Sequence, residues 1–179
     1  MKLKELFESA KKGRSVSDAV TYDYTDGDFW CMERQITTLD GSPAHVKGTF
    51  SCRNNRLTNL EGGPTRVDRS YVCNSNKLTS LKGVASHIGR DFWFNSNKLT
   101  SLEGIHLLVK KMNGKVNALR NPIESHVLGL LLIDGVTEVM LDNKKVAKIL
   151  NKHFGKGEAG LLQAQEELIE AGLEKFAQL

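Results

Sequence analysis

The strongest constraint on this chain is a repeat of 21 residues that runs through its central part. When the sequence is shifted by 21 positions, aromatic residues align with aromatic residues, and cysteines and leucines align with their own kind. Self-similarity at a period of roughly 20 to 50 residues is typical of a solenoid, in which stacked units share one core. The main columns are Phe29, Phe50, Tyr71 and Phe92; Cys31, Cys52 and Cys73; Asn55, Asn76 and Asn97; Leu39, Leu60, Leu81 and Leu102; Gly41, Gly62, Gly83 and Gly104; and Val46, Val67, Ile88 and Val109.

Each unit predicts one short parallel strand followed by a bend. The aromatic residue and the cysteine alternate with the period of two that a strand requires. The asparagine amide carries donors and an acceptor for backbone groups left unpaired at the bend, and two leucines then form the second wall of the core. A fifth unit follows if three residues are inserted between Gly104 and Met112. We therefore expect about five repeats over residues 27–124.

These units resemble the leucine-rich repeat family, whose pattern runs L-x-L-x-x-N/C-x-L. The unit from Phe50 to Gly62 is similar to those of small leucine-rich repeat proteins of tailed bacteriophages. The resemblance implies an α/β solenoid that binds a protein on its concave sheet. It also implies a phage-encoded chain that inhibits or redirects a host protein, for example a defence factor.

The two ends of the array need covers, because a solenoid unit exposes apolar surface to its neighbours. Residues 1–26 are expected to provide an N-terminal helix, Met1 to Lys12, and a lead-in. Residues 125–179 are expected to form a mainly helical cap, with a buried segment from His126 to Ile133, a strand from Val136 to Leu141 and two helices. The expected apolar stripes are Val146, Ile149, Leu150 and Phe154 in the first helix, and Leu161, Leu162, Leu168, Ile169 and Phe176 in the second.

Composition and motifs favour a non-enzymatic protein of the cytoplasm. We expect no secretion signal and no membrane span, because the longest apolar run has seven residues and a span needs about 20. The three cysteines are too few for a disulfide framework, and their one-per-repeat spacing indicates packing rather than zinc binding. The five histidines fit no metalloprotease or nucleophile motif. We predict no catalytic residue, no metal, no cofactor and no small-molecule substrate.

The candidate binding site is the outward column between the buried aromatic and cysteine columns. Trp30 and Trp93 should stand about 14 Å apart, three strands from each other, above Ser51 and Val72. Tryptophan and arginine are enriched at interface hot spots. Cover by the N-terminal segment or the C-terminal cap is the alternative. The predicted partner-binding residues are Trp30, Arg53, Val72, Trp93 and Asn95.

Basic columns suggest a second function. Residues 27–124 contain 14 Lys and Arg against 8 Asp and Glu. Stacked cations repel one another, so they indicate either a site for an acidic partner, including nucleic acid, or ordinary solvated side chains. A third possibility is an interaction through the C-terminal helical hairpin. The basic columns are Arg56, Lys77 and Lys98, which follow the asparagines, and Arg69 and Arg90, which precede the strands.

Overall fold

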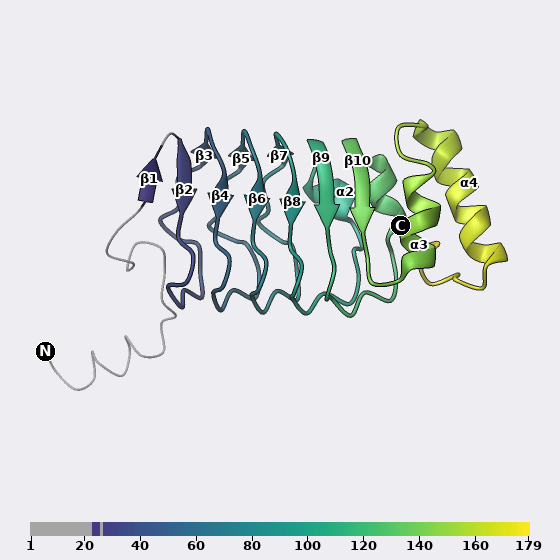
Figure 1. Ribbon diagram of the computed structural model, residues 1–179, viewed down its shortest axis with the longest axis horizontal. Coiled ribbons are helices and arrows are strands. Elements are labelled where there is room, and N and C mark those ends of the chain that lie inside the picture. Colours follow the sequence, from purple (N-terminus) through teal and green to yellow (C-terminus); the bar gives the residue numbers. More distant parts are fainter. Residues whose placement is uncertain (1–22, 26) are drawn as a thin grey trace, which may run out of the picture.

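The computed structural model describes residues 23–25 and 27–179 as a solenoid of parallel strands that ends in helices (Figure 1). Its turns repeat at the expected spacing, and the α/β short repeat solenoid is confirmed. The predicted helix from Met1 to Lys12 lies outside the described residues. Among the described helices, none is long and apolar enough to cross a membrane.

The first sheet contains the predicted strand of each unit. The strands β2 (Asp28–Trp30), β4 (Phe50–Ser51), β6 (Tyr71–Val72) and β8 (Phe92–Trp93) pair in parallel and continue to β9 (Lys111–Asn117). Phe50 lies beside Tyr71, and Phe92 lies beside Val116. The second pair confirms the three-residue insertion. At the N-terminal end, β1 (Asp23–Thr25) pairs antiparallel with β2.

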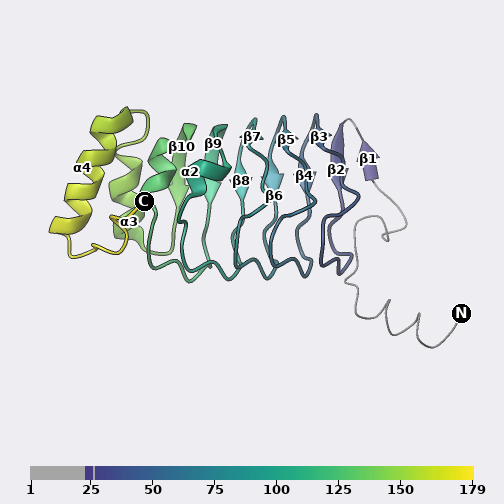
Figure 2. The ribbon, with the colours of Figure 1, turned by 180° about the vertical axis from the view of Figure 1, so that it is seen from behind.

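A second row of strands runs along the other wall of the core and was not anticipated; we call it the second sheet, and it is joined to the first through β9. Each turn carries a further two-residue strand: β3 (His45–Val46), β5 (Arg66–Val67) and β7 (His87–Ile88), which lead to the first residues of β9. Met112, not Val109, continues the column of Val46, Val67 and Ile88. The extra residues of the last turn form the short helix α2 (Ile105–Leu108), which stands in front of the strands when seen from behind (Figure 2).

The core between the sheets is built from stacked identical positions. Rings in successive turns contact one another, with centroids 5.8 Å apart for Phe29 and Phe50 and 4.9 Å apart for Phe50 and Tyr71. Cys31, Cys52 and Cys73 are buried free thiols beside this stack, as the packing interpretation predicted. The turns close at glycines such as Gly83, whose φ of 87° lies in the region that glycine adopts without strain.

The asparagine column links each turn to the previous one. The Oδ1 atom of Asn97 accepts a hydrogen bond from the backbone N–H of Leu78, and its Nδ2 donates to the carbonyl oxygens of Cys73 and Phe94. Asn55 and Asn76 make the equivalent bonds, and so does Asn121 in the fifth unit. The predicted satisfaction of the bend by an amide is confirmed.

The C-terminal part extends the first sheet and then covers it. After the buried 3-10 helix η1 (Leu128–Leu132), strand β10 (Asp134–Met140) adds to β9 in parallel. Asn151, at the end of α3 (Lys144–Asn151), then caps the outer edge of β10, because its amide accepts from Val139 N–H at 2.8 Å and donates to Val139 O at 3.1 Å. This amide takes the place of a further strand.

The two predicted C-terminal helices are present, but one apolar stripe was partly wrong. In α3, Val146, Ile149 and Leu150 are buried as expected. In α4 (Gly157–Glu170), Leu168 is buried, whereas Leu162 and Ile169 are 58% and 50% exposed. Consecutive residues of a helix lie about 100° apart around its axis, so Leu162 and Ile169 cannot share the face of Leu161 and Leu168. Phe176 lies beyond the end of the helix.

Candidate functional site

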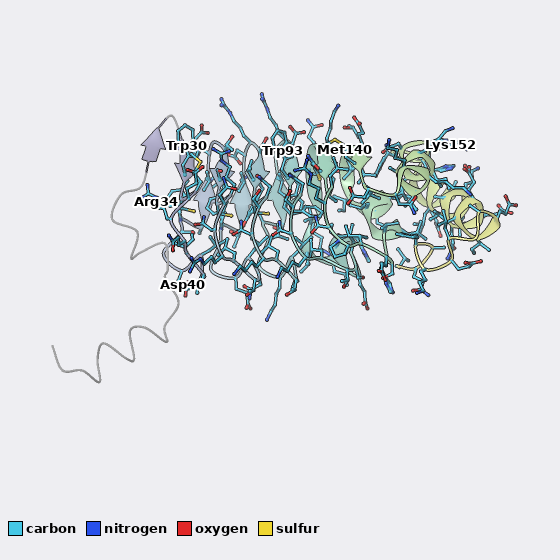
Figure 3. All side chains as sticks on the ribbon, turned by 60° about the horizontal axis from the view of Figure 1, so that its bottom comes forward. Trp30, Arg34, Asp40, Trp93, Met140 and Lys152 are labelled. Carbon is cyan, nitrogen blue, oxygen red and sulfur yellow. The ribbon has the colours of Figure 1, made fainter. Side chains whose placement is uncertain are left out.

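The outer face of the first sheet, the face predicted to be concave, is hollowed into a trough of about 440 Å³. We call this hollow the tryptophan trough. It extends over strands β2 to β9, and Figure 3 shows Trp30 and Trp93 on the same side of the array. Its lining residues are Trp30, Met32, Thr49, Ser51, Arg53, Val72, Asn74, Trp93, Asn95 and Asn117. All five predicted partner-binding residues are therefore brought together.

The parallel register places the two indoles three strands apart. Trp30 lies beside Ser51, Ser51 beside Val72, and Val72 beside Trp93. Ser51 is buried at the floor, with 6% of its surface exposed, while Trp93 is 42% exposed. Trp30 is half-buried, and Asp23 of β1 lies beside it. The larger indole surface is therefore open to a ligand at the Trp93 end.

Arg53 is held at the edge of the trough by its neighbours in the previous turn. Its Nε atom lies 3.1 Å from the sulfur of Met32, and its Nη2 atom lies 3.6 Å from a carboxylate oxygen of Glu33. Asn95 lies on the same column two turns further on, and its amide donates weakly to Ser96 at 3.5 Å. The arrangement leaves the Asn95 carbonyl and the second Nη atom of Arg53 available for a ligand.

The opposite edge of the trough is electrically compensated within the protein. Asp28 and Asp91 accept hydrogen bonds from the backbone N–H groups of Thr49 and Lys115. The ammonium of Lys115 lies 2.7 Å from Glu138, whose hydrogen bond and charge raise the pKa of that lysine. The trough consequently combines aromatic surface with neutral amide and hydroxyl groups and with one cation, Arg53.

Met140 continues the tryptophan column beyond the repeats and was missed. It lies beside Asn117 in the β9–β10 register, and Figure 3 places it beyond Trp93 on the same side. The signal was present in the sequence, because the strand predicted from Val136 to Leu141 could have been aligned with the fifth unit. A ligand that extends past Trp93 would reach this side chain.

The basic columns flank the first sheet at opposite edges. Arg69 and Arg90 precede β6 and β8, whereas Arg56, Lys77 and Lys98 follow the bends at the other end of the strands. All five side chains are exposed, and none forms an ion pair with a described residue. The structure therefore divides these cations between two edges, with the tryptophan trough between them.

The cysteines are not placed to react. Burial raises the pKa of Cys31 to about 12, and it raises those of Cys52 and Cys73 as well. Thiolate is the reactive and metal-binding form, so these side chains act as small apolar groups. In the described part of the chain, no cluster of three or more His, Cys, Asp and Glu side chains could hold a metal ion.

The helical hairpin forms a separate groove of about 410 Å³ between α3 and α4. Lys152 lies 2.8 Å from Glu167 across this groove, and the buried His153 lies 2.9 Å from the same carboxylate. A basic side chain of α3 and an acidic side chain of α4 therefore pair with each other. Their charges are partly neutralised before any partner arrives.

Comparison with protein-family models, curated proteins and solved structures gave no match to the chain.

Proposed function

We propose that this chain is a non-enzymatic binding module that holds a segment of a partner protein in the tryptophan trough. The observation that carries the proposal is Trp93, a large aromatic side chain that is 42% exposed on an open sheet. Indole surface in water is unfavourable, and tryptophan is the residue type most often found at interface hot spots. A partner that covers Trp93 would remove this cost.

The chemistry of the trough favours a protein segment. Apolar side chains of the partner can pack on Trp30, Val72 and Trp93, and peptide groups can bond to the amides of Asn74 and Asn95. Rigid strands position these groups before binding, so little ordering is needed when the partner arrives. The resemblance to bacteriophage leucine-rich repeat proteins favours a host protein of the bacterial cytoplasm as the partner.

Nucleic-acid binding is the second candidate. It is favoured by the exposed cations that lack an ionic partner among the described residues, such as Lys77 and Arg90. Such contacts would make affinity fall steeply with added salt, and the two indoles could stack on bases. The position of the cations at two separate edges favours this candidate less than the protein hypothesis.

Intrinsic fluorescence provides a direct test, because the chain has only two tryptophans and both line the trough. Peptides are selected from a display library on the full chain and then titrated against it, alongside proteins captured from bacterial lysate. We expect a selected ligand to shift the emission of wild type and of Trp30→Phe. We expect binding to weaken about tenfold or more in Trp93→Ala, the loss typical of a hot spot.

Matched variants decide between the surfaces. Leu162→Ala removes an exposed apolar side chain outside the trough, and Lys98→Ala removes an exposed cation outside the trough for comparison with Arg53→Ala. Equal losses in Leu162→Ala and Trp93→Ala, with unchanged thermal unfolding, would reject the trough. Binding of an oligonucleotide that exceeds that of every peptide and disappears with salt would favour the second candidate.

A further inference from the structure

The outward face of the second sheet carries a groove of about 400 Å³ that the proposed function does not use. We call it the outer groove and define it by Arg66, Asp68, His87, Gly89, Lys111 and Asn113. These residues come from β5, β7, β9 and the positions that follow β5 and β7. The trough lies on the other sheet, so the two surfaces are separate.

Three basic side chains stand in a row in this groove. The register pairs Arg66 with His87 and His87 with Lys111. Neighbouring parallel strands are about 4.8 Å apart, so side chains on adjacent strands can contact the same group of a ligand. Like charges in such a row repel one another unless an anion lies between them. The same row was visible in the sequence, since His45, Arg66 and His87 recur at the 21-residue period.

Acidic side chains compensate only the ends of this row. Asp68 bonds to His45 at 2.9 Å and to Nε of Arg66 at 2.7 Å, which leaves the Nη atoms of that guanidinium for a ligand. The ammonium of Lys111 lies 3.7 Å from Asp134, beyond hydrogen-bond distance. His87, in the middle, has no acidic partner in the part of the chain that the structure describes. The middle position of the row is therefore the one without an acidic neighbour.

Gly89 lets neighbouring turns stack closely at the floor of the groove. A Cβ atom at this position would overlap the carbonyl oxygen of Asp68 in the previous turn. Asn113 adds an amide to the lining. An anion seated here would meet donors from a guanidinium, an ammonium and an amide.

The contact with Ser86 sets which nitrogen of His87 faces the groove. Ser86 Oγ donates to the carbonyl oxygen of Thr65 at 3.4 Å and lies 3.1 Å from His87 Nδ1. A hydroxyl that donates to Thr65 accepts from the ring, which places a hydrogen on Nδ1 and leaves Nε2 free of this contact. Arg66, Asp68 and Lys111 are the charged groups that line the groove with His87.

We propose that the outer groove binds a phosphomonoester, the dianionic phosphate of a phosphorylated side chain or of a small metabolite. Arginine presents a planar fork that matches phosphate oxygens, and lysine adds a point charge. The two fixed cations, Arg66 and Lys111, match a dianion better than the single charge of each phosphodiester, and the ring of His87 lies between them.

The test is NMR titration of the full chain, with the His87 ring signals assigned through His87→Gln. Sulfate, inorganic phosphate and a phosphoserine peptide are each titrated at pH 6.5. We expect saturable shifts at His87 with all three. Arg66→Gln and Lys111→Gln should each weaken binding about tenfold.

Lys98→Gln is the control, because it makes the same change in net charge outside the groove. Equal weakening in Lys98→Gln and Lys111→Gln, or no saturable shift at His87, would overturn the proposal. Tighter binding of the peptide than of free phosphate would identify a phosphorylated protein as the source, and the reverse would identify a metabolite. An oligothymidylate that binds tighter than both would show a phosphodiester site and would also overturn it.

Discussion

The side-chain amide of Asn97 bonds back across the stack to Cys73, with Nδ2 lying 3.1 Å from the carbonyl oxygen of that residue in the preceding turn. The same nitrogen lies 2.8 Å from the carbonyl oxygen of Phe94 in its own turn. One buried amide therefore holds two adjacent turns together. The column of asparagines thus joins the turns through hydrogen bonds, and the rings and leucines join them by packing.

Asn97→Asp should destabilise the solenoid strongly. Aspartate keeps the oxygen that accepts from Leu78 N–H, but it replaces a donor that faces carbonyl oxygens with an oxygen. A buried charge without its partners costs several kcal/mol, so we expect the free energy of unfolding to fall by about 3 kcal/mol. Urea denaturation followed by circular dichroism measures the change.

Asn59→Asp is the matched control for this prediction. Asn59 uses only its Oδ1 atom, which accepts from Glu61 N–H in an exposed turn, and aspartate keeps that atom. Its effect should stay below about 0.5 kcal/mol, as for most surface changes. Similar losses in the two variants would show that the asparagine column does not hold the turns together.

Leu78→Asp should unfold the central array. Leu78 is fully buried among the leucines of the neighbouring turns, where a carboxylate finds no partner. We expect loss of the cooperative thermal transition. Leu162→Asp, at a site that is 58% exposed, should leave the transition unchanged. A normal melt for Leu78→Asp would contradict the burial of this column.

Much of the solenoid could be predicted from the sequence, because repetition at one period fixes the pairing of equivalent residues. The pairing of Phe50 with Tyr71 follows from the columns alone, and so does the role of Asn76 at its own bend, whereas its bond to the previous turn was not predicted. The tryptophan trough follows too, since Trp93 lies between the buried residues Phe92 and Phe94.

The features that were not predicted depend on strands with little sequence pattern or on contacts between residues that are far apart in the chain. Strand β5 adds one buried residue, Val67, to the apolar columns, whereas β4 was recognised because Phe50 and Cys52 alternate with an outward residue. The cap on β10 depends on Asn151, which reaches Val139 only after α3 has folded back. Leu162 was assigned to the core because leucine is usually buried, yet its angle around α4 points it to solvent.

Tyr71→Phe should stabilise the protein. The Tyr71 hydroxyl is buried in the ring stack and has no hydrogen-bond partner among the described residues. A buried hydroxyl without a partner costs about 1 to 3 kcal/mol, so we expect the free energy of unfolding to rise by about 1 kcal/mol. Denaturation in urea measures the gain. Phe92→Tyr, which buries a further hydroxyl in the stack, should have the opposite sign.

Acid should destabilise the helical hairpin through Glu167. Hydrogen bonds from Lys152 and His153 hold the pKa of Glu167 below its ordinary value of 4.5. As pH falls, the unfolded chain therefore takes up this proton before the folded chain does. The stability that ionised Glu167 contributes is complete above about pH 4.5, and it is lost as pH falls through the lower pKa of the folded state. The melting temperature of Glu167→Gln should fall less between pH 5 and pH 3 than that of wild type. Glu166→Gln, one residue away and exposed, should follow the wild-type curve.

The three thiols should be protected in the folded protein and should react together when it opens. Burial places Cys31, Cys52 and Cys73 between turns and raises the pKa of each, so thiolate forms only after exposure to water. With an aromatic disulfide reagent at pH 8, we expect no rapid reaction in buffer and three thiols per chain in strong denaturant. The slow native-state rate should rise in Asn97→Asp, because a weaker link between turns makes opening more frequent. Rapid labelling of Cys52 in the folded wild type would show that the stack is open at its centre.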